Sequence, residues 1–317
     1  MTNLIPGTIF NDLLFGTFLD DHFTASSGND TLVGSYGNDI LDGQTGFDVA
    51  DYTRLNATVT LGALGALSKG ALGADTLKSI ERVNGSALSG DTIDLSGAIS
   101  GGPVVVTGAS VNLSTTIGTV VVNGSGGGLP VSVQVTNFEN IFGTIYNDTL
   151  IGNAVANTIN GNAGNDYIDG QDGNDLLLGG DGNDGVVGGN GADTLIGGAG
   201  QDKMSGGPGN DRFAWSTTKE SPAGSGDVIT DFSFGDILDF QLIDARVSVS
   251  GNQSFTWIGS AAFSGEGQLR FQGGTGGVFI QGNTSGLTGA ELEVFLAGVP
   301  ATFAGLAAVG LPANIIL

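Results

Sequence analysis

Residues 179–205 read GGDGNDGVV-GGNGADTLI-GGAGQDKMS, which is one nine-residue unit written three times. The same spacing puts an acid or amide at eight positions: Asp148, Asn157, Asp166, Asp175, Asp184, Asp193, Asp202 and Asp211. Two residues after each of them lies one apolar side chain, in order Leu150, Ile159, Ile168, Leu177, Val186, Leu195, Met204 and Phe213. One unit cannot bury its apolar side chain alone, but copies can stack on each other. The spacing therefore predicts a solenoid with acidic, glycine-rich turns.

The nine-residue unit resembles the GGxGxDxUx nonapeptide of the RTX, or haemolysin-type calcium-binding, proteins, as residues 179–187 and 197–205 illustrate. In that family two nonapeptides form one coil of a parallel β-roll, and the turns hold Ca²⁺ between successive coils. The resemblance implies an all-β parallel β-roll with calcium ligands at Asp30, Asp39, Asp48, Asp148, Asp166, Asp175, Asp184, Asp193, Asp202 and Asp211. It implies further ligand positions at the turn glycines Gly161, Gly164, Gly170, Gly173, Gly179, Gly182, Gly188, Gly191, Gly197, Gly200, Gly206 and Gly209.

The composition favours cations as partners. Of 317 residues, 58 are glycine, 32 are acidic and 9 are basic, which gives a formal net charge of −23. This charge excludes nucleic acid and anionic membranes as the main partners, because both would repel the chain. The alternative is an ordinary solvated acidic surface, but the acids fall in phase with the repeat. We therefore expect them to bind calcium.

The number of ions follows from the pairing of turns. In a roll, turns on one side lie two units apart, so one edge carries Asp148, Asp166, Asp184 and Asp202, and the other Asp175, Asp193 and Asp211. Taking one ion for each pair of adjacent turns gives roughly five or six sites in residues 143–214 and two or three near the N-terminus, hence about eight ions. They would reduce the net charge from −23 to about −7. Asx-turn or Asn-ladder hydrogen bonding without a metal remains the alternative.

The pattern divides the chain into four segments. Residues 1–51 keep the nine-residue spacing in a partly degenerate roll, and residues 143–214 form the main calcium-binding roll. Residues 52–142 are rich in Gly, Val and Thr and predict short strands, which either continue the roll without calcium or form an inserted sheet. Within them, only residues 74–82 indicate a helical turn. Residues 215–317 are aromatic-rich and predict a β cap that closes the solenoid.

The C-terminal segment resembles the domain that follows the β-roll in serralysin-type secreted proteases, on motifs such as residues 226–232 and 235–240. The apolar tail, residues 301–317, resembles the uncleaved C-terminal signal of type I secretion, and a simple closing strand also explains it. No signal-peptide pattern follows Met1, and no apolar run is long enough to span a membrane. The chain has no cysteine. We therefore expect a secreted, extracellular or cell-surface protein, exported by a type I apparatus and stabilised by calcium.

The residues of the chain give catalysis little support. The single histidine, His22, excludes the HExxHxxGxxH zinc motif and any multi-histidine metal site. No GxSxG nucleophile elbow occurs. The acid pairs Asp20 with Asp21 and Asp227 with Asp231 lie where acids are needed for calcium, so a glycosidase-like use is disfavoured. We predict that the chain is not an enzyme.

Two functions fit these patterns. The first is a non-enzymatic structural, surface-assembly or adhesion component that folds when it meets calcium outside the cell. The second is a polysaccharide-binding or accessory module, similar to the roll modules of alginate epimerases and secreted proteases. A polysaccharide groove needs clustered exposed aromatic rings, whereas Trp215, Trp257 and most phenylalanines fall in the cap and are predicted to be core. This favours the first function, with self-assembly or a cell-surface polysaccharide as a further partner.

Overall fold

The computed structural model describes residues 2–62, 65–96, 105–125, 132–286, 289–300, 306, 311 and 313–317. The chain forms two compact units, Met1–Asn153 and Ala154–Leu317. Within the described residues the elements are β-strands, except for the 3-10 helix η2 (Gly70–Leu72). In those same parts of the chain, no helix has the length and hydropathy needed to cross a membrane. The predicted all-β class is confirmed.

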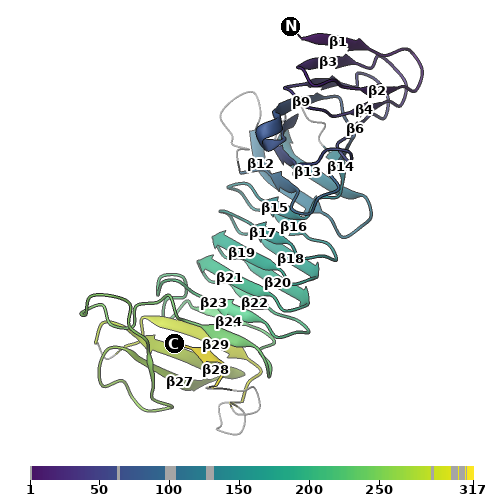
Figure 1. Cartoon of the computed structure of the whole chain (residues 1–317). Coiled ribbons are helices and arrows are strands. Elements are labelled where there is room, and N and C mark those ends of the chain that lie inside the picture. The colour runs from purple at the N-terminus through teal and green to yellow at the C-terminus, as the bar shows by residue number, and fades with distance from the viewer. Residues whose placement is uncertain are drawn as a thin grey trace. The chain divides into compact units, whose positions relative to one another are not determined.

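The second unit begins with a roll of two parallel sheets (Figure 1). Each strand pairs in parallel with the strand two units along, so that Leu177 lies beside Leu195 and Val186 beside Met204. This register confirms the predicted coil of two nonapeptides. One sheet contains β17 (Thr158–Asn160), β19 (Leu176–Asp181), β21 (Thr194–Ala199) and β23 (Arg212–Ala214). The other contains β18 (Tyr167–Asp172), β20 (Gly185–Asn190), β22 (Lys203–Ser205) and β24 (Asp227–Ile229).

The apolar residue of each unit points into the roll, as predicted. Seven consecutive units of the second compact unit have this side chain fully buried: Ile159, Ile168, Leu177, Val186, Leu195, Met204 and Phe213. Neighbours in sequence face outward, because side chains alternate along a strand. Leu176 beside Leu177 is 38% exposed. The core is therefore a single column of side chains, one for each repeat.

We expect Leu177→Ala to lower the free energy of unfolding by about 2–5 kcal/mol, since it leaves a cavity in this column. Leu176→Ala is the matched control, because it removes the same atoms from the outer face of the same strand. That control should cost about 1 kcal/mol or less. Urea denaturation at saturating calcium measures both values. Equal losses of unfolding free energy in the two variants would contradict the conclusion that Leu177 faces into the roll and Leu176 faces outward.

The first unit also begins as two parallel sheets. One contains β1 (Asn3–Pro6), β3 (Asp21–Thr24), β5 (Ile40–Asp42) and β9 (Ala74–Lys78). The other contains β2 (Leu13–Phe15), β4 (Thr31–Val33), β6 (Val49–Asp51) and β10 (Arg82–Asn84). Phe23, Leu32, Leu41 and Ala50 are fully buried at the inward position. Residues of the degenerate N-terminal block therefore stack like those of the second unit.

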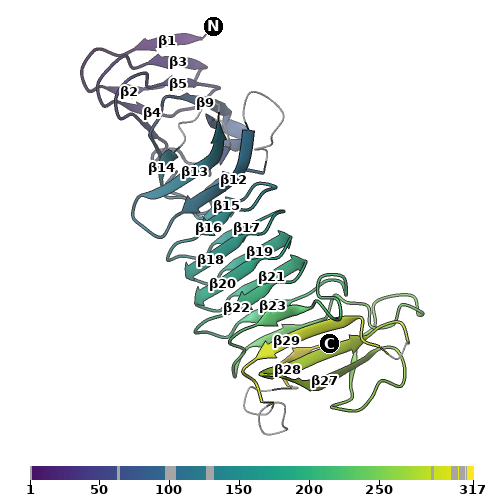
Figure 2. The same cartoon turned by 180° about the vertical axis from the view of Figure 1, so that it is seen from behind.

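The segment between the two repeat blocks combines both predicted alternatives. β10, β11 (Thr92–Asp94) and β15 (Asn140–Phe142) continue the parallel coils. Antiparallel excursions interrupt them, and Figure 2 shows one, formed by β12 (Val105–Asn112), β13 (Gly118–Ser125) and β14 (Ser132–Thr136). The other joins β7 (Thr60–Gly62), β8 (Ala66–Ser68) and β9. β16 (Thr149–Ile151) pairs in parallel with β12.

The predicted helical turn over residues 74–82 is wrong. That segment forms β9 and the start of β10. Along β9 the side chains of Asp75 and Leu77 are buried while their neighbours are exposed. This period of two is the pattern of a strand with one buried face, and pairing with β5 and β8 selects it over a local helical preference.

The C-terminal part of the second unit continues both sheets. β25 (Ile237–Asp239) pairs with β30 (Ile315–Ile316), so the tail provides a closing strand. Residues 301–305, 307–310 and 312 of the tail lie outside the described residues. β29 (Leu292–Ala297), β28 (Gly277–Asn283), β27 (Gln268–Gly274) and β26 (Thr256–Trp257) extend the other sheet. Trp215 is 1% exposed and stacks on Phe240 with ring centroids 5.1 Å apart, whereas Trp257 is only half-buried.

Candidate metal centre

The turn carboxylates form a ladder through their Oδ1 atoms. The main-chain N–H of Asp166 donates to Oδ1 of Asp184 at 2.8 Å, and that of Asp184 donates to Oδ1 of Asp202 at 2.8 Å. On the opposite edge the same bonds run along Asn157, Asp175, Asp193 and Asp211 at 2.8, 2.9 and 3.0 Å. Within the second unit the acids therefore line two edges, as the spacing predicts. Hydrogen bonding without a metal therefore accounts for these Oδ1 atoms.

The second carboxylate oxygen has a different environment. In the described structure Oδ2 is buried and has no hydrogen-bond donor in Asp30, Asp48, Asp175, Asp184, Asp193, Asp202 and Asp211. A buried carboxylate oxygen without a donor is costly, because it loses water without gaining a partner. Repeated in one turn after another, such oxygens fit a cation better than they fit a metal-free fold.

A main-chain carbonyl and a missing side chain complete the surroundings of Oδ2. A Cβ built on Gly188 would lie 2.5 Å from Oδ2 of Asp193 and 2.5 Å from the carbonyl oxygen of Gly206. The two oxygens thus face a space that only glycine leaves free. Searching the described residues reveals no cluster of three His, Cys, Asp or Glu side chains. Carboxylate and carbonyl oxygens are the ligands of a hard cation such as Ca²⁺, so the residues present fit calcium.

Backbone conformation separates the turns into two classes. In the first class, which we call open turns, the residue four before the aspartate has a positive φ between 66° and 114°. There are eight: Ser26, Gln44, Asn162, Gln171, Gly180, Gly189, Gly198 and Gly207 occupy this position before Asp30, Asp48, Asp166, Asp175, Asp184, Asp193, Asp202 and Asp211. Four of these residues are not glycine, and a positive φ outside glycine is a strained conformation common at ligand sites.

In the second class, the closed turns, a hydroxyl residue at the same position binds the carboxylate. Thr17 donates its main-chain N–H to Oδ2 of Asp21 at 2.6 Å, and Thr8 does the same for Asp12 at 2.6 Å. Two predicted calcium ligands, Asp39 and Asp148, lie in such turns. Ser35 Oγ donates to Asp39 Oδ2 at 3.2 Å. The Thr144 N–H donates to Asp148 Oδ2 at 2.6 Å.

Six further acids belong to the ladder but are absent from the predicted ligand set: Asp75, Glu81, Asp91, Glu139, Asp227 and Asp236. The N–H of Asp39 donates to Asp75 at 2.9 Å, although 36 residues separate them. The N–H of Asp202 donates to Asp227 at 2.9 Å. The sequence contains a signal for part of this set of acids. Asp227 and Asp236 are again nine residues apart, and Glu81 and Glu139 occupy equivalent places in two similar motifs.

Burial raises the pKa of six open-turn carboxylates, those of Asp48, Asp175, Asp184, Asp193, Asp202 and Asp211. Loss of water is the largest cause, and the negative charges of neighbouring acids add to it, while the N–H bond to Oδ1 opposes it. The pKa rises to about 7 for Asp175 and Asp202 and to about 6 for Asp184 and Asp211. The metal-free roll therefore concentrates negative charge that it cannot solvate.

A pH dependence follows for calcium-depleted protein. An aspartate with an unfolded pKa of 3.8 and a folded pKa of about 6 or 7 favours the folded state below pH 3.8, and this contribution is lost as the pH rises through 6–7. We therefore expect metal-free protein to gain β-structure as the pH falls from about 8 to about 5. Circular dichroism in calcium-depleted buffers measures it.

A His22→Ala variant controls for the one other side-chain type that changes charge in this range. It should follow the same curve as the natural chain, because the carboxylates carry the effect. Stability of metal-free protein that stays constant or rises toward pH 8 would show that these carboxylates are not the titrating groups.

Comparisons with known proteins place these turns in a family. No curated protein sequence matches the chain significantly. Among solved structures, the extracellular lipase LipA from Serratia marcescens is 15% identical with a TM-score of 0.30, and the match covers 100% of this chain but only 40% of the lipase. The AlgE6R3 subunit of the Azotobacter vinelandii mannuronan C5-epimerase is 27% identical with a TM-score of 0.32, over 54% of this chain and 79% of that subunit. The AlgE6R2 subunit is 23% identical with a TM-score of 0.34, over 56% and 92%.

A family model gives the direct assignment. The model of the RTX calcium-binding nonapeptide repeat matches four times, over residues 15–50, 142–177, 151–186 and 178–213. All eight open turns lie inside the matched ranges. Residues 15–50 and 142–213 of this chain are therefore RTX calcium-binding nonapeptide repeats.

Proposed function

We propose that the chain is an exported protein that folds on calcium outside the cell and acts there as a structural, surface-assembly or adhesion component. The observation that carries the proposal is the set of buried Oδ2 atoms without a donor in the open turns. In the turns of Asp48, Asp175, Asp184 and Asp193 this oxygen lies beside a glycine and a main-chain carbonyl, a combination that suits Ca²⁺. One ion for each open turn would give about eight bound ions.

Export by a type I apparatus is part of this proposal. The chain has no cysteine and a net charge of −23, so calcium is the available means of stabilising a folded state. Free calcium is far more abundant outside cells than inside them. If folding requires calcium, the chain would stay unfolded until it is exported. The apolar C-terminal tail supports this route through its resemblance to a type I signal.

A non-enzymatic role fits the positions of the candidate catalytic groups. Asp227 accepts hydrogen bonds from Trp215 Nε1 at 2.7 Å and from the main chain of Asp202 at 2.9 Å. Asp231 accepts bonds from Ser205 Oγ at 2.6 Å and the Gly206 N–H at 3.0 Å. Both acids are thus engaged in holding adjacent coils together, which leaves the pair poorly placed for acid–base work.

Native mass spectrometry with calcium titration tests the proposal. About eight ions should bind, and light scattering should show larger particles forming only in calcium. A protein that binds no ions would refute the calcium-dependent fold. A calcium-loaded protein that stays monomeric and contacts no surface polymer would refute the assembly and adhesion role.

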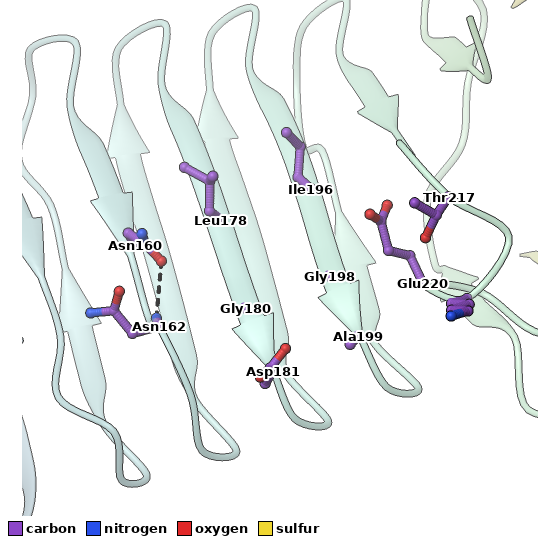
Figure 3. A pocket seen from close by; sticks show the side chains of 11 residues that line it. Asn160, Asn162, Leu178, Gly180, Asp181, Ile196, Gly198, Ala199, Thr217 and Glu220 are labelled. Carbon is purple, nitrogen blue, oxygen red and sulfur yellow. Dashed lines mark hydrogen bonds between the residues drawn. The ribbon is translucent and has the colours of Figure 1, made fainter. Parts of the chain in front are cut away.

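Polysaccharide binding is a second candidate, favoured by one surface of the first unit. A cavity of about 210 Å³ is lined by the exposed rings of Phe18 and Tyr36 together with Arg54. Rings of this kind stack on sugars, and these two lie outside the cap, whose aromatic residues are the ones predicted to be core. By contrast, the groove in Figure 3, about 450 Å³ in volume, is lined by Leu178, Ile196, Glu220 and similar side chains without a ring. Retention on a glycan array that is lost in Phe18→Ala would favour this candidate.

A further inference from the structure

One turn of the first unit holds a lysine between its two carboxylates. Lys69 is 0% exposed, and its Nζ lies 3.2 Å from Oδ2 of Asp39 and also contacts Oδ1 of Asp75. Both carboxylates are fully buried as well. The N–H of Asp39 donates to Oδ1 of Asp75 at 2.9 Å, which is the bond that joins successive coils throughout the ladder. The lysine thus lies inside a turn that is otherwise built like the calcium-binding ones.

An inserted hairpin brings this lysine into place. Strands β5 and β9 pair directly, with Ile40 beside Thr76, although the chain makes an excursion through β7, β8 and η2 between them. Lys69 lies between β8 and η2, and its main-chain N–H donates to the carbonyl of Gly73 at 2.8 Å. Its position is therefore set by the same hairpin that doubles the spacing between Asp39 and Asp75.

Hydroxyl groups add hydrogen bonds to both carboxylates beside the ammonium. Tyr52 donates its hydroxyl to Oδ2 of Asp75 at 2.7 Å, and Ser35 Oγ donates to Oδ2 of Asp39 at 3.2 Å. Neither Asp39 nor Asp75 retains a buried oxygen without a donor. Asp30 and Asp48, on the opposite edge of the same unit, do retain one.

The glycine-lined space of an open turn is also missing here. In the Asp48 turn, a Cβ on Gly43 would lie 2.5 Å from Asp48 Oδ2. The equivalent residue before Asp75 is Gly70, whose Cβ position has no atom within 4 Å. Before Asp39 the equivalent residue is Gly34, and the ring of Tyr52 fills the space beside it. Beside Asp39, the Tyr52 ring thus occupies the space that an open turn leaves free, and beside Asp75 the glycine does not face the carboxylate at all.

We propose that the ammonium group of Lys69 is the cation of the Asp39–Asp75 turn, in the place that calcium takes in the turn of Asp48. Its three donors and single charge, helped by two hydroxyls, compensate the two buried carboxylates. The first unit then binds calcium along one edge only and is closed on the other edge by its own side chains. This inference rests on the calcium sites proposed above.

Ion counting by native mass spectrometry of the full chain tests the assignment. Asp48→Asn removes an open-turn carboxylate and should lower the ion count by one. Asp75→Asn removes a carboxylate of the lysine-bearing turn and should leave the count unchanged. Loss of one ion in Asp75→Asn would overturn the proposal. Absence of any ion in the natural chain would instead refute the calcium sites.

Hydrogen exchange of the β5 and β9 amides provides an independent test, which needs no count of ions. Lys69→Met keeps the length of the side chain but leaves two buried carboxylates without a cation, so protection should fall on the order of 100-fold at saturating calcium. Lys78→Met, which removes an equal charge from an exposed position on β9, should leave protection unchanged. Equal protection in Lys69→Met and the natural chain would overturn the proposal.

Discussion

Removal of calcium is expected to unfold the repeat blocks, with loss of most of the β-sheet circular dichroism and its return when calcium is restored. In the open turns the buried oxygens lack donors and neighbouring carboxylates repel each other. Without an ion, burial of these charges opposes folding, and the chain entropy of a glycine-rich solenoid is left uncompensated. The ions therefore contribute folding free energy directly.

Small-angle scattering gives a second readout of the same experiment. A fully unfolded chain of 317 residues has a radius of gyration of about 63 Å. Magnesium at the same concentration is the control, because it demands a near-ideal octahedral site and dehydrates reluctantly. It should not restore the structure. Full β-structure in excess chelator at neutral pH would contradict the prediction.

Gly188→Ala is expected to abolish one calcium site and weaken the two coils beside it. Its Cβ would lie 2.5 Å from both Asp193 Oδ2 and the Gly206 carbonyl, in the space assigned to the ion. Both oxygens would have to move apart, and a main-chain carbonyl in a packed coil cannot move cheaply. We expect a loss of one ion, and at least about tenfold more calcium should be needed for folding, which is about 1.4 kcal/mol.

Gly185→Ala is the matched control in the same strand. There the nearest atom to the new Cβ is Cδ2 of Tyr167 at 3.5 Å, an ordinary contact. Alanine also has the better strand geometry, so the variant should bind as the natural chain does. Isothermal titration calorimetry compares the two variants directly. Similar calcium binding in both would show that the glycine-lined space is not the ion position.

The roll itself was predictable because its signal is local and repeated. One apolar residue two positions after each acid fixes which side chain faces inward, and the buried column from Ile159 to Phe213 follows it. The same nine-residue spacing predicts that the acids line two edges of the roll. Long-range pairing carried no such signal. Asp75 joins the ladder only because β9 returns to β5 across an inserted hairpin, which no periodicity records.

The division between open and closed turns lies partly in the sequence. Thr8, Thr17 and Thr144 occupy the position four before the acid in closed turns, where glycine or an amide is found in most open ones. Residue type alone does not decide it. Ser26 lies in an open turn and Ser35 in a closed one, and the sign of φ distinguishes them. That sign depends on the packing of adjacent coils, which a single sequence does not contain.

The Oδ1 ladder gives the roll a polarity. Every rung joins the amide of one coil to a carboxylate that lies later in the chain, as in the bond from Asp184 to Asp202 and then from Asp202 to Asp227. On one edge the last carboxylate is that of Asp227, which accepts a bond from Trp215 Nε1, while the main-chain N–H of Asp227 donates to Ser221 Oγ. The turn amide of each coil therefore depends on the next coil along the chain for its acceptor, and at the Asp227 end of the ladder that acceptor is held by a side chain of the protein itself.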